Sequence, residues 1–143
     1  MSPRFTLLFD QEFQYRSIPG LDPGLLFPAL PVGLIGPSGA DDLLAIIDTG
    51  ATHSLFDGRR AKSIGLDLMA GKSVPLTGLS GTLPARLHAV TLEILGSRFE
   101  CEVAFSESEI RRELLGRHDL FSRARFGSRE GMSLGLGYFH PEP

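Results

Sequence analysis

Short apolar runs separated by turn-forming residues dominate the pattern of this chain. Residues 43–47 form one such run, which ends abruptly on Asp48, and residues 32–35 form another, with a turn-rich segment between them. Short apolar runs bounded by glycine and proline are typical of buried β-strands. We therefore predict a hairpin that delivers Asp48 at its end. A carboxylate there is costly unless it is paired, which indicates either a structural network or a reactive site.

Further strands are predicted on both sides of this hairpin. Residues 4–9 read as a strand at the N-terminus. Residues 74–94 alternate around a glycine-flanked tip, which predicts a second hairpin, and residues 99–105 alternate again. From residue 121 onward, repeated glycines predict only short strands and turns.

Helical signals are few. Asp57 is a candidate N-cap for a short helix that Gly65 would end. Residues 109–115 could add a helical turn or two before Gly116. Residues 17–31 carry four prolines and two glycines, which predicts an irregular loop.

The elements together predict a mostly-β domain, a closed barrel or sandwich with one or two short helices. At 143 residues the chain is expected to be a single domain spanning residues 1–143. We divide it into an N-terminal arm over about residues 1–31, a core over about 32–121 and a C-terminal tail over about 122–143.

Composition narrows the classes of function. A net charge of −3, with 42% hydrophobic and 22% charged residues, gives no electrostatic footprint for nucleic acid or an anionic membrane. No apolar stretch approaches the roughly 20 residues of a membrane span. Cys101 is the only cysteine, so no intrachain disulfide can form, and we interpret it as a buried structural thiol. A cytoplasmic location is the simplest expectation.

Three motifs occur in a fixed order along the chain. They are Asp48-Thr49-Gly50-Ala51 after the apolar run, the tip Gly78-Leu79-Ser80-Gly81, and Leu114-Leu115-Gly116-Arg117. This combination resembles the retropepsin family, the retroviral and retrotransposon type of aspartic peptidase, over about residues 32–121. An Asp-Thr-Gly triplet alone is weak, but its buried flank and the later apolar-Gly-Arg motif make the match specific.

The resemblance implies a homodimeric endopeptidase that needs no cofactor and acts on a peptide or protein substrate. Each chain would contribute one Asp48, and two close carboxylates would hold one proton between them. The ionised partner would take a proton from a bridging water that attacks the peptide carbonyl, and the protonated partner would donate to its oxygen. Such a mechanism implies an activity profile shifted toward acid.

The resemblance also implies roles for the other motif residues. Thr49 would lock the paired loops across the two-fold axis, and Gly50 would let backbone N–H groups approach the carboxylates. Residues 78–81 would form a flap over the substrate. Structural support would come from Ala51, Leu115, Gly116 and Arg117. One departure is Thr52, because retroviral members often place at that position an acid that pairs with the arginine.

Other interpretations stay open or are weaker. A catalytically inactive retropepsin-like module for binding or dimerisation would use Asp48 only as a hydrogen-bond acceptor. Asp48, His53 and Ser54 lie too close in sequence for a serine triad, so we interpret His53 and Ser54 as loop-packing residues. No metal site is expected, because the other histidines and the cysteine lack the close paired spacing of zinc ligands: His88, Cys101, His118 and His140.

Overall fold

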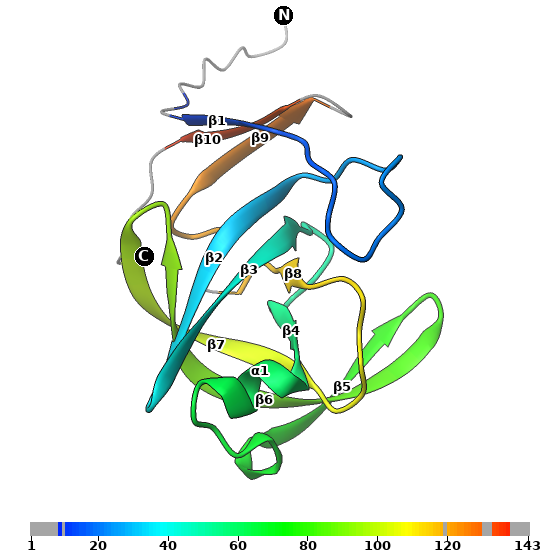
Figure 1. Ribbon diagram of the computed structural model, residues 1–143, viewed down its shortest axis with the longest axis vertical. Coiled ribbons are helices and arrows are strands. Elements are labelled where there is room, and N and C mark those ends of the chain that lie inside the picture. Colours follow the sequence, from blue (N-terminus) through cyan, green and yellow to red (C-terminus); the bar gives the residue numbers. More distant parts are fainter. Residues whose placement is uncertain (1–8, 10, 119, 130–132, 138–143) are drawn as a thin grey trace, which may run out of the picture.

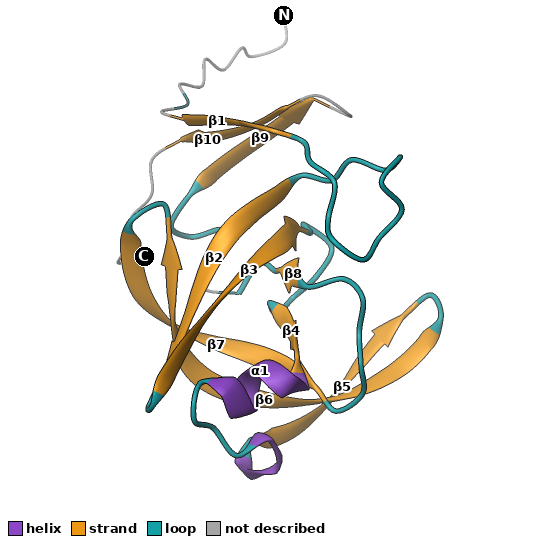
Figure 2. Ribbon diagram, viewed as in Figure 1, coloured by secondary structure: helices purple, strands orange, loops and turns teal. Residues whose placement is uncertain are grey.

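The computed structural model describes residues 9, 11–118, 120–129 and 133–137. Strands dominate this part of the chain, with one α-helix and one 3-10 helix (Figures 1 and 2). In chain order the elements are β1 (Gln11–Gln14), β2 (Ala29–Gly36), β3 (Gly39–Ile47), β4 (Leu55–Asp57), α1 (Gly58–Ser63), η1 (Leu68–Ala70), β5 (Lys72–Gly78), β6 (Gly81–Ile94), β7 (Ser97–Ser106), β8 (Leu114–Leu115), β9 (Arg125–Arg129) and β10 (Ser133–Gly137). The strand predicted over residues 4–9 lies outside the described residues, apart from Phe9.

The hairpin of β2 and β3 confirms the prediction that a strand delivers Asp48. The two strands pair antiparallel from Ala29↔Ile46 to Gly36↔Gly39. Both are longer than their apolar runs, so the irregular segment predicted to reach residue 31 already gives way to β2 at Ala29. A side chain at Gly36 would clash with the backbone oxygen of Ile64, so glycine is required where the turn packs on α1.

The large sheet closes on itself. Its seven strands run in the order β2-β3-β8-β4-β7-β6-β5, and β2 pairs additionally with β6. This extra pairing closes a ring of six strands, in the order β2, β3, β8, β4, β7 and β6. Strand β5 lies outside the ring and pairs with β6. A closed sheet leaves few free edges and encloses its inward-facing side chains. The enclosed core includes Leu30, Leu34, Phe56, Leu92, Phe105 and Leu115, all fully buried.

The helices are short and lie at the surface of the ring. Asp57 caps α1 by accepting a hydrogen bond from the Arg59 backbone, and Gly65 follows with a φ of 88°, as predicted. The second helix predicted over residues 109–115 is wrong: residues 109–113 are irregular and the last two form β8. Pairing with β3 and β4 decides the conformation there, overriding local propensity. Among the described residues, no helix has the length and apolar character needed to cross a membrane.

Segments from both ends of the chain form a second sheet. Its strand order is β1-β10-β9, antiparallel throughout, and it lies beside the ring at the top of Figure 1. The central strand, β10, is paired along both sides. The predicted boundaries of the arm, core and tail stay a prediction.

The closed ring predicts a large stability cost for a cavity at its centre. Leu92 is fully buried and pairs with Leu34 on one side and Phe99 on the other. Leu92→Ala is expected to lower the free energy of unfolding by about 2–5 kcal/mol, measured by urea denaturation. The control is Leu79→Ala at a fully exposed turn, expected to change it by less than about 0.5 kcal/mol. Equal effects of the two substitutions would contradict the proposed core.

Candidate active site

Asp48 lies where β3 ends and a tight turn begins. Its backbone N–H donates to the Leu115 carbonyl at 3.0 Å, which extends the pairing of β3 with β8 by one residue. Its carboxylate accepts the Gly50 N–H at 2.9 Å, and its carbonyl accepts the Ala51 N–H at 3.2 Å. The side chain is half-buried. The carboxylate is therefore held by the backbone of its own turn while part of its surface stays open.

A second loop, residues 115–118, runs alongside this turn. The Arg117 N–H donates to the Ala51 carbonyl at 2.8 Å, and the His118 N–H donates to the Thr52 carbonyl at 2.7 Å. With the Asp48 bond to β8, three backbone hydrogen bonds join the two loops. Segments more than 60 residues apart in sequence are thereby fixed against each other, and we call them the paired loops (residues 48–54 and 115–118).

The crossing of the paired loops requires a glycine and a buried hydroxyl. The Gly116 N–H donates to the Ser54 Oγ at 3.0 Å, and Ser54 is fully buried. Any side chain at Gly116 would clash with the carbonyl group of His53. Leu115 beside it is fully buried in the ring. Leu115 and Gly116 thus pack behind the turn that carries Asp48.

Arg117 contacts the residue that departs from the retroviral pattern. Its Nη2 donates to the Thr52 Oγ1 at 3.4 Å, a long hydrogen bond, and both side chains are exposed. A neutral hydroxyl therefore stands where a carboxylate would form an ion pair. Thr49 is exposed as well.

The four predicted flap residues form the turn between β5 and β6. The hairpin pairs up to Gly78↔Gly81 and projects from the body of the molecule (Figure 1). All four residues are exposed, Leu79 completely. A Cβ added at Gly78 or Gly81 would meet no atom within 4 Å. The tip thus stands clear of the paired loops within one chain.

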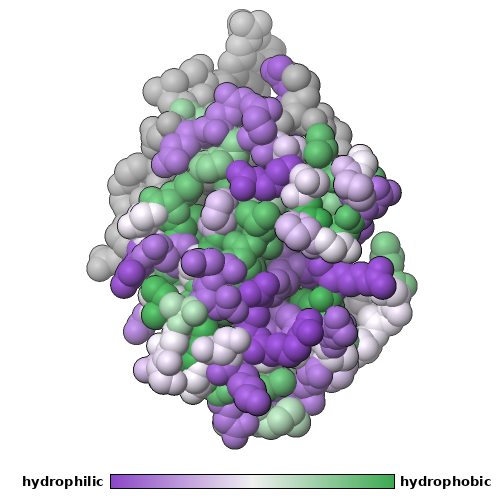
Figure 3. Space-filling view, in the orientation of Figure 1, coloured by the Kyte–Doolittle hydropathy of each residue, from purple (hydrophilic) through white to green (hydrophobic). Residues whose placement is uncertain are grey.

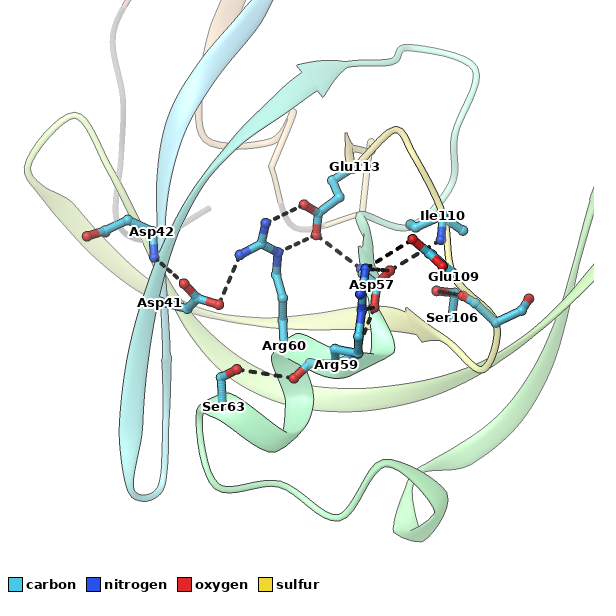
Figure 4. Close-up of polar contacts among 11 residues, drawn as sticks. Asp41, Asp42, Asp57, Arg59, Arg60, Ser63, Ser106, Glu109, Ile110 and Glu113 are labelled. Carbon is cyan, nitrogen blue, oxygen red and sulfur yellow. Dashed lines mark hydrogen bonds and ion pairs between the residues drawn. The ribbon is translucent and has the colours of Figure 1, made fainter. Parts of the chain in front are cut away.

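An ion-pair network anchors Glu113, the residue that directly precedes β8. The Arg60 guanidinium on α1 donates to both carboxylate oxygens of Glu113, at 2.6 and 2.7 Å, and to Asp41 of β3 at 2.9 Å (Figure 4). Figure 3 shows hydrophilic residues gathered over α1 and the segment that precedes β8. The hydrogen bonds to Glu113 raise the pKa of Arg60 above its usual value, although burial opposes them. Since Glu113 directly precedes β8, this bidentate pair fixes where the second loop begins.

Asp57 joins the same network from the end of β4. Burial acts to raise the pKa of Asp57, but hydrogen bonds from the Arg59 side chain and from the backbone of Arg59 and Ile110 outweigh it and leave this pKa below its usual value. The Asp57 backbone N–H in turn donates to Glu113 at 3.1 Å. Sequence reasoning recognised Asp57 as a cap but missed Arg60 and Glu113, which lie 53 residues apart and carry no local signal.

Two shallow clefts on the chain lie away from Asp48. One of about 550 Å³ is lined by residues of α1 and residues 66–68 and 106–109, and one of about 360 Å³ lies over the ion-pair network. Neither is lined by Asp48, Thr49 or Gly50. These clefts therefore do not bring a ligand to the paired loops.

The sequence model of the aspartyl protease family matches residues 35–118. That match spans more than half of the chain and includes both paired loops and the β5–β6 hairpin. The chain belongs to the aspartyl protease family. No curated protein sequence matches the chain with significance.

Solved structures support a retropepsin-like fold. A retropepsin-like aspartic protease from Rickettsia conorii is 16% identical, with a TM-score of 0.60, and the alignment covers 87% of this chain and 98% of that one. EIAV protease in complex with the inhibitor HBY-793 is 19% identical, with a TM-score of 0.50, covering 64% of this chain and 82% of that one. At such identities the likeness establishes the fold, and it confirms the mostly-β, retropepsin-like prediction.

Glycine at position 116 is expected to be essential for the paired loops of this aspartyl protease family member. Gly116→Ala forces the backbone of His53 to move and is expected to lower the free energy of unfolding by about 1–3 kcal/mol, measured by urea denaturation. Gly78→Ala is the matched control, because its new methyl group meets open space. Equal stability of the two variants would contradict the crossing of the loops.

The ion-pair network predicts a loss of stability in acid. The pKa of Asp57 is lower folded than unfolded, so its contribution is present above about pH 4 and is lost as pH falls through the folded value. Asp57→Asn keeps a cap acceptor but removes the charge that the Arg59 side chain and the Ile110 N–H bind, so it is expected to destabilise the protein by about 1 kcal/mol at pH 7, with a smaller difference at pH 3. Urea denaturation at both pH values measures this, with exposed Asp42→Asn as control. A difference independent of pH would contradict a role for the charge.

Proposed function

We propose that this chain is an aspartic endopeptidase that acts as a homodimer, with one Asp48 from each subunit in a shared catalytic dyad. The observation that carries the proposal is the placement of Asp48: its carboxylate is held at the end of β3 by the paired loops and remains half-buried. Membership of the aspartyl protease family supports the same chemistry.

The dimer is required because the chain has one Asp-Thr-Gly sequence. A single carboxylate can act as base or as acid, but hydrolysis of a peptide needs both roles at once. Two Asp48 side chains a few ångströms apart would hold one proton between them. The ionised carboxylate takes a proton from the attacking water, and the protonated one donates to the carbonyl oxygen as it gains charge.

Thr49 and Gly50 act through position in this proposal. Exposed Thr49 is available to hydrogen-bond to the partner loop, and the Gly50 N–H already donates to the Asp48 carboxylate. Ala51 and Arg117 hold the two loops together through their backbone hydrogen bond. These residues orient the carboxylates without taking part in proton transfer.

The β5–β6 hairpin would cover the substrate. Its tip, Gly78 to Gly81, is exposed and could bind an extended peptide by adding main-chain hydrogen bonds. Closure would exclude water from the dyad.

Terminal strands can contribute to this dimer in a limited way. Within one chain β10 is paired on both sides, with β1 and β9. Among the described strands of this sheet, the outer edges of β1 and β9 remain for pairing with a second chain. A dimer contact through this sheet would therefore use one of those two edges.

Replacing Asp48 tests the chemistry. Asp48→Asn keeps the shape and the acceptor for the Gly50 N–H but removes the ionisable group, so kcat/KM on a diverse peptide library is expected to fall about 10³-fold or more. Asp42→Asn, an exposed acid of β3, is the matched control and is expected to keep full activity. Equal cleavage by the Asp48→Asn variant would exclude the proposed mechanism.

Mixing the two proteins tests whether the dyad is shared. With a ninefold excess of the Asp48→Asn chain and random exchange of subunits, the activity per wild-type chain is expected to fall about tenfold. Unchanged activity would mean that one chain suffices. A dimer in sedimentation with no cleavage of any peptide would favour the inactive binding or dimerisation module instead.

A further inference from the structure

Three potential metal ligands converge beside the paired loops, although no spacing in the sequence predicts it. His53 lies in the first loop, His118 ends the second, and Glu102 projects from β7. One donor atom from each lies within 4.8 Å of the other two. The His53 Nε2 is 3.9 Å from the Glu102 Oε1, and the two imidazole rings have centroids 5.1 Å apart.

We propose that His53, Glu102 and His118 form a binding site for a divalent transition-metal ion such as zinc. Two imidazoles and one carboxylate are a donor set that zinc uses, with water completing a tetrahedron. This site does not depend on peptidase activity, because none of its three ligands belongs to the proposed dyad.

The present spacing is close to what zinc requires. Donors about 2.1 Å from a tetrahedral ion lie about 3.4 Å from one another. The His53 and Glu102 atoms must therefore approach by about 0.5 Å, and no pair by more than about 1.4 Å. Side-chain rotations achieve such shifts without moving the backbone.

The backbone at all three positions is already fixed. The His118 N–H donates to the Thr52 carbonyl at 2.7 Å, and the carbonyl group of His53 lies against Gly116. Glu102 pairs with Ala89 in the ladder of β6 and β7. Binding would thus order three side chains rather than a loop, which keeps its entropic cost small.

The ion can reach the site from solvent. The side chains of His118 and Glu102 are exposed, the latter by 50%, whereas that of His53 is exposed by only 18%. His53 forms the inner side of the site and the other two its rim. An ion pair between His53 and Glu102 alone at such a surface would contribute little. A bound ion would tie both paired loops to β7 and so stabilise the crossing behind Asp48.

The test is metal titration of the full chain. Zinc, followed by calorimetry, is expected to bind at one ion per chain, and cobalt(II) to give the visible absorption of a tetrahedral site. Glu102→Gln and His118→Ala are each expected to weaken binding at least about tenfold. Glu100→Gln is the matched control, since it is exposed on the same strand two residues away, and is expected to bind like the wild type.

Thermal unfolding gives a second readout. Free zinc at a hundredfold excess over Kd is expected to raise Tm by about 5–10 °C in the wild type and in Glu100→Gln, but not in Glu102→Gln. Because Glu102 is exposed, its variant keeps the fold and decides the outcome even if His118→Ala unfolds. A wild-type Kd weaker than about 1 mM, equal affinity of Glu102→Gln, or a cobalt–thiolate band that places Cys101 in the ligand set would overturn the proposal.

Discussion

Backbone hydrogen bonds between two distant loops are the constraint on which this structure depends. Asp48, Ala51 and Thr52 in one loop bond to Leu115, Arg117 and His118 in the other. Such bonds require the backbones of the two loops to lie in direct contact. A side chain at residue 116 would prevent this contact. The buried Ser54 hydroxyl satisfies the Gly116 N–H at the point of closest approach, where an unpaired donor would be costly. The position of the Asp48 carboxylate follows from this crossing.

The closed ring and the ion pairs make that crossing rigid. β8 is only two residues long, yet it pairs with β3 on one side and β4 on the other. So short a strand has little stability of its own, and the bidentate Arg60–Glu113 pair anchors the residue before it to α1. The pair is partly buried and Arg60 also bonds to Asp41, so its charges are compensated within the network. A polar cluster thus supports the candidate active site from outside the core.

Local signals explain what the sequence could predict. The apolar run before Asp48, the Asp57 cap and the glycine-flanked tip each depend on a few neighbouring residues, and each forms as expected. The predicted helix over residues 109–115 does not form, because its last two residues are strand β8, which pairs with β3 and β4 from distant parts of the sequence. Arg60 with Glu113, and His53 with Glu102 and His118, meet only through the closed sheet. No spacing along the chain distinguishes them from ordinary surface residues.

The two halves of the candidate site are ordered to different extents in a single chain. The loop that carries Asp48 has its backbone bonds already made, so association of two chains would spend little free energy on ordering it. The β5–β6 tip, by contrast, is exposed, and a Cβ added at Gly78 or Gly81 would meet no described atom within 4 Å. In the proposed peptidase, contacts for the tip would come from a substrate or a second chain. The proposed peptidase would use this difference, because its acid and base must be fixed in position while the substrate enters and leaves.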